Sequence, residues 1–97
     1  MTVQIASIRH KALRRFAETG LASGLPSGSV ERLRNILTYL AAIEREDELL
    51  IPPKFGAHRL IGDRRGEWSL TITRNWRLTF RVNEAGAIEE VDLEDYH

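Results

Sequence analysis

The stretch WSLTITRNWRLTFRV, residues 68–82, decides the fold of this chain. Apolar and polar side chains alternate along it, which is the period of a half-buried strand, and Arg74-Asn75 breaks the alternation in the middle. The sequence therefore predicts two strands joined by a tight turn at Arg74-Asn75. The apolar face of this hairpin carries Trp68, Leu70, Ile72, Trp76, Leu78, Phe80 and Val82. We expect the opposite face to be open to a ligand, and it carries Ser69, Thr71, Arg77, Thr79 and Arg81.

The residues on both sides of the hairpin predict further strands. Residues 58–63 are strand-like and precede it, while a turn at residues 84–86 follows it. Val91 and Leu93 then continue the inward alternation. Because Ile88 is out of phase with Val91, we expect a β-bulge or an irregular start in this last strand.

The N-terminal half predicts a short strand and two helices. Residues 3–8 alternate weakly, and residues 10–18 have helical spacing that ends at Gly20. From about Ser29 to Glu46, apolar residues recur at steps of three and four, which predicts a longer amphipathic helix. We therefore expect one α+β domain over residues 1–97, in which an N-terminal strand and two helices pack on one face of a small, mainly antiparallel, curved β-sheet.

The net charge of zero hides a strong segregation of charge along the chain. Residues 54–81 carry seven Lys and Arg against two acids, whereas residues 82–97 carry six acids and no Lys or Arg. Basic side chains on adjoining strands indicate a polyanion such as RNA. The candidates for contact with RNA or the ribosome are Arg59, Arg64, Arg65, Arg74 and Arg81. The alternative is that the basic strands pair with the acidic last strand, since cross-strand ion pairs are common.

The composition excludes several classes of protein. The chain has no cysteine, which removes disulfides and thiolate metal sites. No stretch approaches the roughly 20 consecutive apolar residues of a membrane helix, and the N-terminus lacks the layout of a signal peptide. We therefore expect a cytoplasmic protein with no membrane association, no metal and no small-molecule cofactor.

Several short strings of the sequence resemble a known family of toxins. They are IRHKALRRF (residues 8–16), RLRNIL (32–37), HRL (58–60), GD (62–63), GEWS (66–69), NWRLTF (75–80) and DYH (95–97). In this order and at this spacing they look like a HigB-type toxin of the RelE superfamily, and the likeness covers nearly the whole chain. The resemblance implies a type II toxin that enters the ribosomal A site and cuts the translated mRNA. It also implies a HigA-type helix-turn-helix antitoxin as the partner.

The resemblance places the active site at His58, Arg77, Tyr96 and His97. A metal-independent ribonuclease removes a proton from the 2′-hydroxyl, stabilises charge on the phosphate and protonates the leaving 5′-oxygen, so it needs imidazoles and fixed cations. His58 and His97 are the candidate proton-transfer pair. Arg77 is the candidate phosphate clamp, and Tyr96 is expected to stack on a base or to orient the scissile nucleotide.

Ile61 departs from the family pattern. Well-studied members have an active-site lysine at the position of Ile61, and an aliphatic side chain cannot stabilise charge on a phosphorane. Loss of one such donor typically costs about 100- to 1000-fold in rate, so the sequence predicts a slow or mild toxin. Arg59 lies two residues earlier and in a regular strand would share the face of Ile61, which makes Arg59 a candidate replacement for the lysine.

Other interpretations remain open from the sequence alone. Arg77 is alternatively an ion-pair partner of Asp92 or Glu94. The whole chain is alternatively a catalytically silent relative that keeps antitoxin or RNA binding, which the substitution at Ile61 makes credible. An unrelated small α+β scaffold is a third interpretation, and it predicts no basic, concave sheet face.

Overall fold

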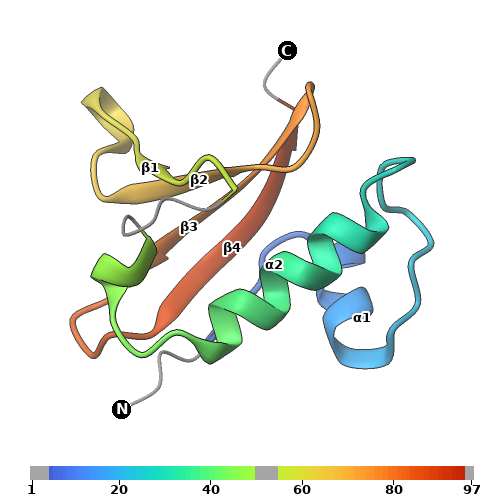
Figure 1. Cartoon of the computed structure of the whole chain (residues 1–97), viewed down its shortest axis with the longest axis horizontal. Coiled ribbons are helices and arrows are strands. Elements are labelled where there is room, and N and C mark those ends of the chain that lie inside the picture. The colour runs from blue at the N-terminus through green and yellow to red at the C-terminus, as the bar shows by residue number, and fades with distance from the viewer. Residues whose placement is uncertain (1–4, 50–54, 96–97) are drawn as a thin grey trace.

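A computed structural model describes residues 5–49 and 55–95 of the chain (Figure 1). The elements in chain order are α1 (Lys11–Thr19), α2 (Val30–Ala42), the 3₁₀ turn η1 (Glu46–Leu49), β1 (His58–Arg59), the 3₁₀ turn η2 (Gly62–Arg64), β2 (Glu67–Thr71), β3 (Trp76–Val82) and β4 (Ile88–Asp95). The four strands form one antiparallel sheet in the order β1-β2-β3-β4. Figure 1 shows α1 and α2 together on one side of this sheet, which confirms the expected α+β architecture.

The core lies between the helices and the apolar face of the sheet. The helices contribute Leu13 and Phe16 from α1 and Leu33, Ile36 and Leu40 from α2. The sheet contributes the predicted inner face: Trp68, Leu70, Ile72, Leu78 and Phe80 are buried, and Trp76 and Val82 are half-buried against them. Reading the apolar positions at period two therefore identified the correct face of the hairpin.

The N-terminal segment is less regular than predicted. The expected strand over residues 3–8 is reduced to two isolated parallel bridges, Ile5 with Ile88 and Ile8 with Val91, and residues 3 and 4 lie outside the described part of the chain. The backbone N–H groups of Ala6 and Arg9 donate to the carbonyls of Ile88 and Val91 at 2.6 Å. The segment therefore covers the free edge of β4 without forming a full ladder.

The last strand contains the predicted bulge. Thr79 pairs with Asp92 and Arg81 pairs with Glu89, so β4 has one residue more than β3 in this interval. Glu90 takes up the extra length with a positive φ of 55°. Because the bulge inserts one residue, both Ile88 and Val91 face the core despite their odd spacing.

The observed boundaries of α1 agree with the predicted ones to within one residue, whereas those of α2 differ at its C-terminal end. Gly20 ends α1 as expected, in the left-handed conformation with a φ of 81°, and His10 is the residue that caps its N-terminus. The second helix ends at Ala42 instead of Glu46. The reason is local: the Glu48 carboxylate accepts hydrogen bonds from the backbone N–H groups of Glu44 and Arg45 at 2.6 and 2.7 Å and starts a new turn. No helix in the described part of the chain is long and apolar enough to cross a membrane.

Two other elements are shorter than predicted. The strand-like run at residues 58–63 ends at Arg59, because Gly62 has a φ of 71° and opens the η2 turn. The connection between β2 and β3 spans residues 72–75, so it is wider than a two-residue turn at Arg74-Asn75. The backbone N–H groups of Ile72 and Thr73 both donate to the Trp76 carbonyl and close this connection.

Leu70→Ala is expected to destabilise the fold by about 2–5 kcal/mol, because Leu70 is fully buried and its truncation leaves a cavity in the core. The free energy of unfolding in urea measures this loss. The matched control is Leu21→Ala, since Leu21 is 56% exposed and its truncation should cost less than about 0.5 kcal/mol. Equal losses for the two variants would contradict the assignment of the core.

Candidate active site

The face of the sheet opposite the helices is polar, and strand register arranges its side chains in three rows. The middle row contains His58, Ser69, Thr79 and Asp92; the row on one side of it contains Thr71, Arg77 and Glu94, and the row on the other side contains Glu67, Arg81 and Glu89. His58 and Arg77 thus share one face, at a Cα separation of about 12 Å by ideal sheet spacing. Two long side chains at that separation can reach a single phosphodiester. Tyr96 and His97 directly follow β4 but lie outside the described residues.

A group of ion pairs and hydrogen bonds, which we call the Glu94 cluster, covers the middle of this face. Arg64 from η2 donates from Nη1 to one Glu94 oxygen at 2.7 Å and from Nη2 to the other. Its Nε and Nη2 atoms also donate to the Glu67 carboxylate at 3.0 and 2.8 Å. Arg77 donates to Glu94 from Nε and Nη2 at 3.4 and 3.2 Å, and the Thr79 hydroxyl donates at 2.8 Å. One carboxylate therefore organises two guanidinium groups.

The cluster shifts the pKa of its carboxylates in the direction expected for paired acids. Hydrogen bonds from Arg64, and then from Thr79 and Arg77, lower the pKa of Glu94 to about 2 against the opposing effect of burial. The Arg64 hydrogen bond also lowers the pKa of Glu67. Glu94 and Glu67 raise the pKa of Arg64 in turn. The cluster is therefore fully charged over the physiological pH range.

Glu94→Gln is expected to lower the free energy of unfolding by about 2 kcal/mol at neutral pH. This is less than the whole pKa shift of Glu94 would give, because water screens its ion pairs with the arginines. Since the folded-state pKa of Glu94 lies below its ordinary value of 4.5, the stabilisation is present above about pH 4.5 and is lost as the pH falls toward 2. Urea unfolding at several pH values should thus show the gap between wild type and variant closing on acidification. The control is Glu84→Gln in the exposed turn, where a similar pH-dependent gap would contradict the role of the cluster.

Two residues expected on an open face are in fact buried. Ser69 and Thr79 are each only 2% exposed. Both are short side chains in the middle of the sheet, and the hydroxyl of Thr79 donates to Glu94, which Arg64 also contacts. The surface available to a ligand is therefore the outer side of the Glu94 cluster and not the backbone of the strands.

Arg64, Arg77 and Arg81 all have carboxylate partners, as one of the two interpretations of the charge pattern predicts. Arg81 pairs with Glu67 at 3.8 Å and with Glu90 at 3.6 Å. The alternative in which basic strands pair with the acidic last strand is thus confirmed for Arg77 and Arg81, and Arg64 joins them from η2. Contact of these residues with RNA stays a prediction, as it does for Arg65 and Arg74, which are exposed.

His58 is placed by a close approach of the preceding residues to β2. The backbone N–H of Thr71 donates to the Phe55 carbonyl at 2.7 Å. Gly56 has a φ of 65°, and a Cβ there would lie 2.8 Å from the Thr71 hydroxyl, so only glycine fits. The Nδ1 atom of His58 donates to the Gly56 carbonyl at 3.0 Å. Because a carbonyl only accepts, this bond selects the tautomer that presents Nε2 of a neutral ring as an acceptor.

The expected position of Arg59 is wrong. β1 ends at Arg59, so Arg59 and Ile61 do not share the face of a regular strand. Arg59 pairs across the sheet with Trp68, on the face opposite His58. Its Cζ lies 5.0 Å from the centroid of the Trp68 ring, and its Nη2 lies 3.5 Å from a carboxylate oxygen of Glu46. Ile61 directly precedes η2, and 88% of its surface is exposed. The structure thus gives no support to Arg59 as a substitute for the family lysine.

Arg32 holds the segment that precedes His58, a role that the sequence analysis did not predict. Its Nε donates to the Thr71 carbonyl at 2.8 Å, and its guanidinium lies 5.1 Å from the Phe55 ring, so α2 fixes the segment that precedes His58. The available signal was weak: Arg32 lies one turn before Ile36, at the border of the apolar stripe. No three or more His, Asp or Glu side chains within residues 5–49 and 55–95 are grouped so as to hold a metal ion.

The whole-chain comparisons show which family this chain is similar to. Residues 6–97 match the family of RelE-like toxins of type II toxin-antitoxin system HigB. The chain belongs to the HigB family. It is 38% identical over 95 residues to the endoribonuclease HigB of Proteus vulgaris, a match that covers 96% of this chain and 99% of the relative. The resemblance drawn from the sequence strings is therefore confirmed.

The fold of this HigB-family toxin is also that of a solved relative. The toxin-antitoxin complex RelBE2 of Mycobacterium tuberculosis contains a chain with a TM-score of 0.52 and 14% identity, and the match covers 98% of our chain and 99% of that one. At this identity the likeness shows the RelE-like fold alone. Membership of a type II toxin-antitoxin family gives this chain an antitoxin as its partner.

Proposed function

We propose that this HigB-family toxin enters the ribosomal A site and cuts the mRNA under translation. The family and the 38% identical relative support endoribonuclease activity; action on the ribosome is the finer part of the proposal. The observation that supports the finer proposal is the shared polar sheet face of His58 and Arg77, next to the strand that leads into Tyr96 and His97. These residue types are those that metal-independent attack of a 2′-hydroxyl requires.

The hydrogen bond of His58 indicates its role in the reaction. With Nδ1 donating to Gly56, the Nε2 lone pair is the one available to accept the 2′-hydroxyl proton, so His58 acts as the general base. His97 then protonates the leaving 5′-oxygen. Tyr96 stacks on a base beside the scissile bond. This assignment follows from the tautomer of His58, which the fold fixes before any substrate binds.

Arg77 stabilises the charge that develops on the phosphate. A guanidinium presents donors in a plane and suits two non-bridging oxygens. Glu94 holds that guanidinium in place through Nε and Nη2, so the cation is positioned before the reaction. The rest of the Glu94 cluster fixes Glu94 itself through Arg64 and Thr79. We propose a HigA-type helix-turn-helix antitoxin as the partner and the cytoplasm as the compartment.

A second candidate function is supported by specific observations. The family lysine is replaced by the exposed Ile61, Arg59 is turned to the other face, and Arg64 and Arg81 pair with carboxylates. A chain with this distribution of cations is alternatively a silent relative that binds antitoxin or RNA without cutting it. The first function predicts slow cleavage, and the second predicts none.

Cleavage in a reconstituted translation system separates the two functions. Labelled mRNA is incubated with the purified protein in the presence and absence of translating ribosomes, with and without its antitoxin. The expected result is a set of fragments that requires ribosomes and disappears with antitoxin. Binding of antitoxin without fragments, together with normal growth when the protein is induced alone, would favour the silent module.

A further inference from the structure

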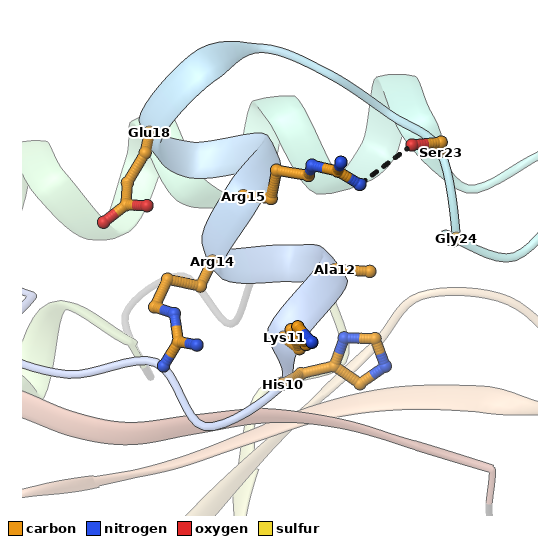
Figure 2. A pocket seen from close by; sticks show the side chains of 8 residues that line it. All are labelled: His10, Lys11, Ala12, Arg14, Arg15, Glu18, Ser23 and Gly24. Atoms are coloured by element: carbon orange, nitrogen blue, oxygen red, sulfur yellow. Dashed lines mark hydrogen bonds between the residues drawn. The ribbon is translucent and has the colours of Figure 1, made fainter.

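A basic pocket lies beside α1 (Figure 2), whereas the proposed active site lies on the sheet face opposite the helices. It has a volume of about 710 Å³ and is lined by His10, Lys11, Arg14 and Arg15 from the helix and by Ser23 and Gly24 from the following loop. Pockets of about 300–1,000 Å³ are the size that takes small ligands or segments of a polymer. The sequence predictions for RNA contact did not include any of these residues.

Helical spacing and one glycine build this pocket. Lys11, Arg14 and Arg15 lie three and four residues apart and form one stripe, while Leu13 and Phe16 face the core. The loop closes against the stripe because Gly24 has a φ of 87°, and a Cβ there would lie 3.0 Å from that of Ala12. Arg15 reaches across to the Ser23 hydroxyl at 3.4 Å. Figure 2 shows this hydrogen bond spanning the space between helix and loop.

The pocket presents donors and positive charge. The backbone N–H of Leu13 donates to Nδ1 of His10 at 3.2 Å, so a neutral His10 ring carries its proton on Nε2, as a donor. Lys11, Arg14 and Arg15 add three cations against the single acid Glu18. Figure 2 shows Arg14 and Glu18 pointing to the same side of the helix, away from Ser23 and Gly24, while Arg15 and the His10 ring point toward the loop side. The site is therefore suited to an anion.

The position of α1 brings the pocket to the same end of the sheet as the proposed active site. Ile8 pairs in parallel with Val91, and the Arg9 N–H donates to the Val91 carbonyl. Because the segment runs parallel to β4, α1 begins beside the C-terminal half of that strand, which carries Glu94 and Asp95. Because α1 lies on the helix-covered side of the sheet, an RNA bound at the opposite, polar face would pass around the edge of β4 to reach this pocket.

We propose that the α1 pocket binds the phosphodiester backbone of RNA at phosphates other than the one that is cut. The proposal rests on the proposed function, since it assumes an RNA at the end of β4. Guanidinium forks and an ammonium group bind phosphate oxygens without reading sequence. An acidic protein segment fits less well, because the lining is charged, polar or small and lacks the apolar side chains that usually hold a peptide.

Binding measurements on two charge-matched double variants test the proposal. Arg14→Gln/Arg15→Gln removes two charges from the pocket, and Arg34→Gln/Arg45→Gln removes two exposed charges outside it. Glutamine keeps the helix propensity of arginine, so both variants are expected to fold. The probes are a labelled single-stranded RNA with 2′-O-methyl groups, which prevent cleavage, ribosomes carrying the same RNA as message, and the antitoxin. For the free RNA, the pocket variant should lower the slope of log affinity against log salt by about 1.4, since each lost phosphate contact accounts for about 0.7.

Each outcome decides the proposal. Weaker binding of free RNA by the pocket variant identifies the message as the ligand, and weakening only on ribosomes identifies ribosomal RNA; both support the proposal. Equal effects of the two variants, no effect of the pocket variant, or a loss confined to antitoxin binding would overturn it. Cleavage by the wild type is scored separately, so failure of the proposed function is visible as intact mRNA while the binding assay still reports on the pocket.

Discussion

Arg77→Ala is expected to lower the maximal rate of mRNA cleavage on ribosomes by about 100- to 1000-fold, the usual cost of removing one positioned donor from a developing negative charge. Arg77 is the guanidinium that Glu94 holds on the polar face shared with His58. Single-turnover cleavage with the protein in excess over programmed ribosomes separates the maximal rate from the apparent affinity. Under the proposed function, the charge beside Arg77 develops in the transition state, so the loss should fall on the rate.

Two variants serve as controls for the Arg77 experiment. Arg77→Lys keeps the charge but loses the planar fork, so it should recover only part of the rate. Arg81→Ala removes a guanidinium from the same face of the same strand, two rows away, and should change the affinity more than the rate. Folding is expected to persist in Arg77→Ala, since Glu94 remains bonded to Arg64 and Thr79. A similar loss of rate in Arg77→Ala and Arg81→Ala would contradict a specific role for Arg77.

The sequence predicted most of the fold because local periodicity and local turns determine it. Strand alternation over residues 68–82 placed Trp68 and Leu78 in the core, and the phase break between Ile88 and Val91 identified the bulge. Gly20 marked the end of α1. In each case the signal lies within a few residues of the feature, so no tertiary information was needed.

The features that were missed depend on contacts between distant parts of the chain or on side chains with unusual local roles. Arg64 crosses to Glu94, 30 residues later, and this contact buries Thr79 on a face that alternation alone marks as open. The early end of α2 depends on Glu48 capping backbone groups, a role that a stripe of apolar residues does not reveal. Arg59 faces away from His58 because neighbouring side chains of a strand point to opposite faces, and its guanidinium contacts Trp68 and Glu46 on that other face.

The same distinction applies to the candidate site. The family pattern indicated His58 and Arg77, and register places both on one face. It did not indicate the groups that hold them: Gly56 and Arg32 fix the segment of His58, and Glu94 fixes Arg77. Positioning groups of this kind are defined by distances across strands, which one sequence without a structure does not contain.

Ile61→Lys is expected to raise the maximal cleavage rate by up to about 100-fold, because it supplies a cation at the position where the resemblance drawn from the sequence implies an active-site lysine. Ile61 is 88% exposed at the start of η2, and Arg64 ties η2 to the Glu94 cluster beside Arg77. A lysine on this loop therefore stands at the rim of the candidate site. Substitution at so exposed a position should change the free energy of unfolding by less than about 0.5 kcal/mol, so the change in rate reports on chemistry.

Ile61→Met and Arg59→Gln separate the charge of the new lysine from other effects. Methionine gives a flexible side chain without a charge, so Ile61→Met should leave the cleavage rate unchanged. Arg59→Gln should also leave it unchanged, because Arg59 is engaged with Trp68 and Glu46 on the other face. A fall in rate for Arg59→Gln would mean that Arg59 does serve the reaction despite its position. A gain for Ile61→Met equal to that of Ile61→Lys would mean that side-chain shape, and not the missing cation, limits this toxin.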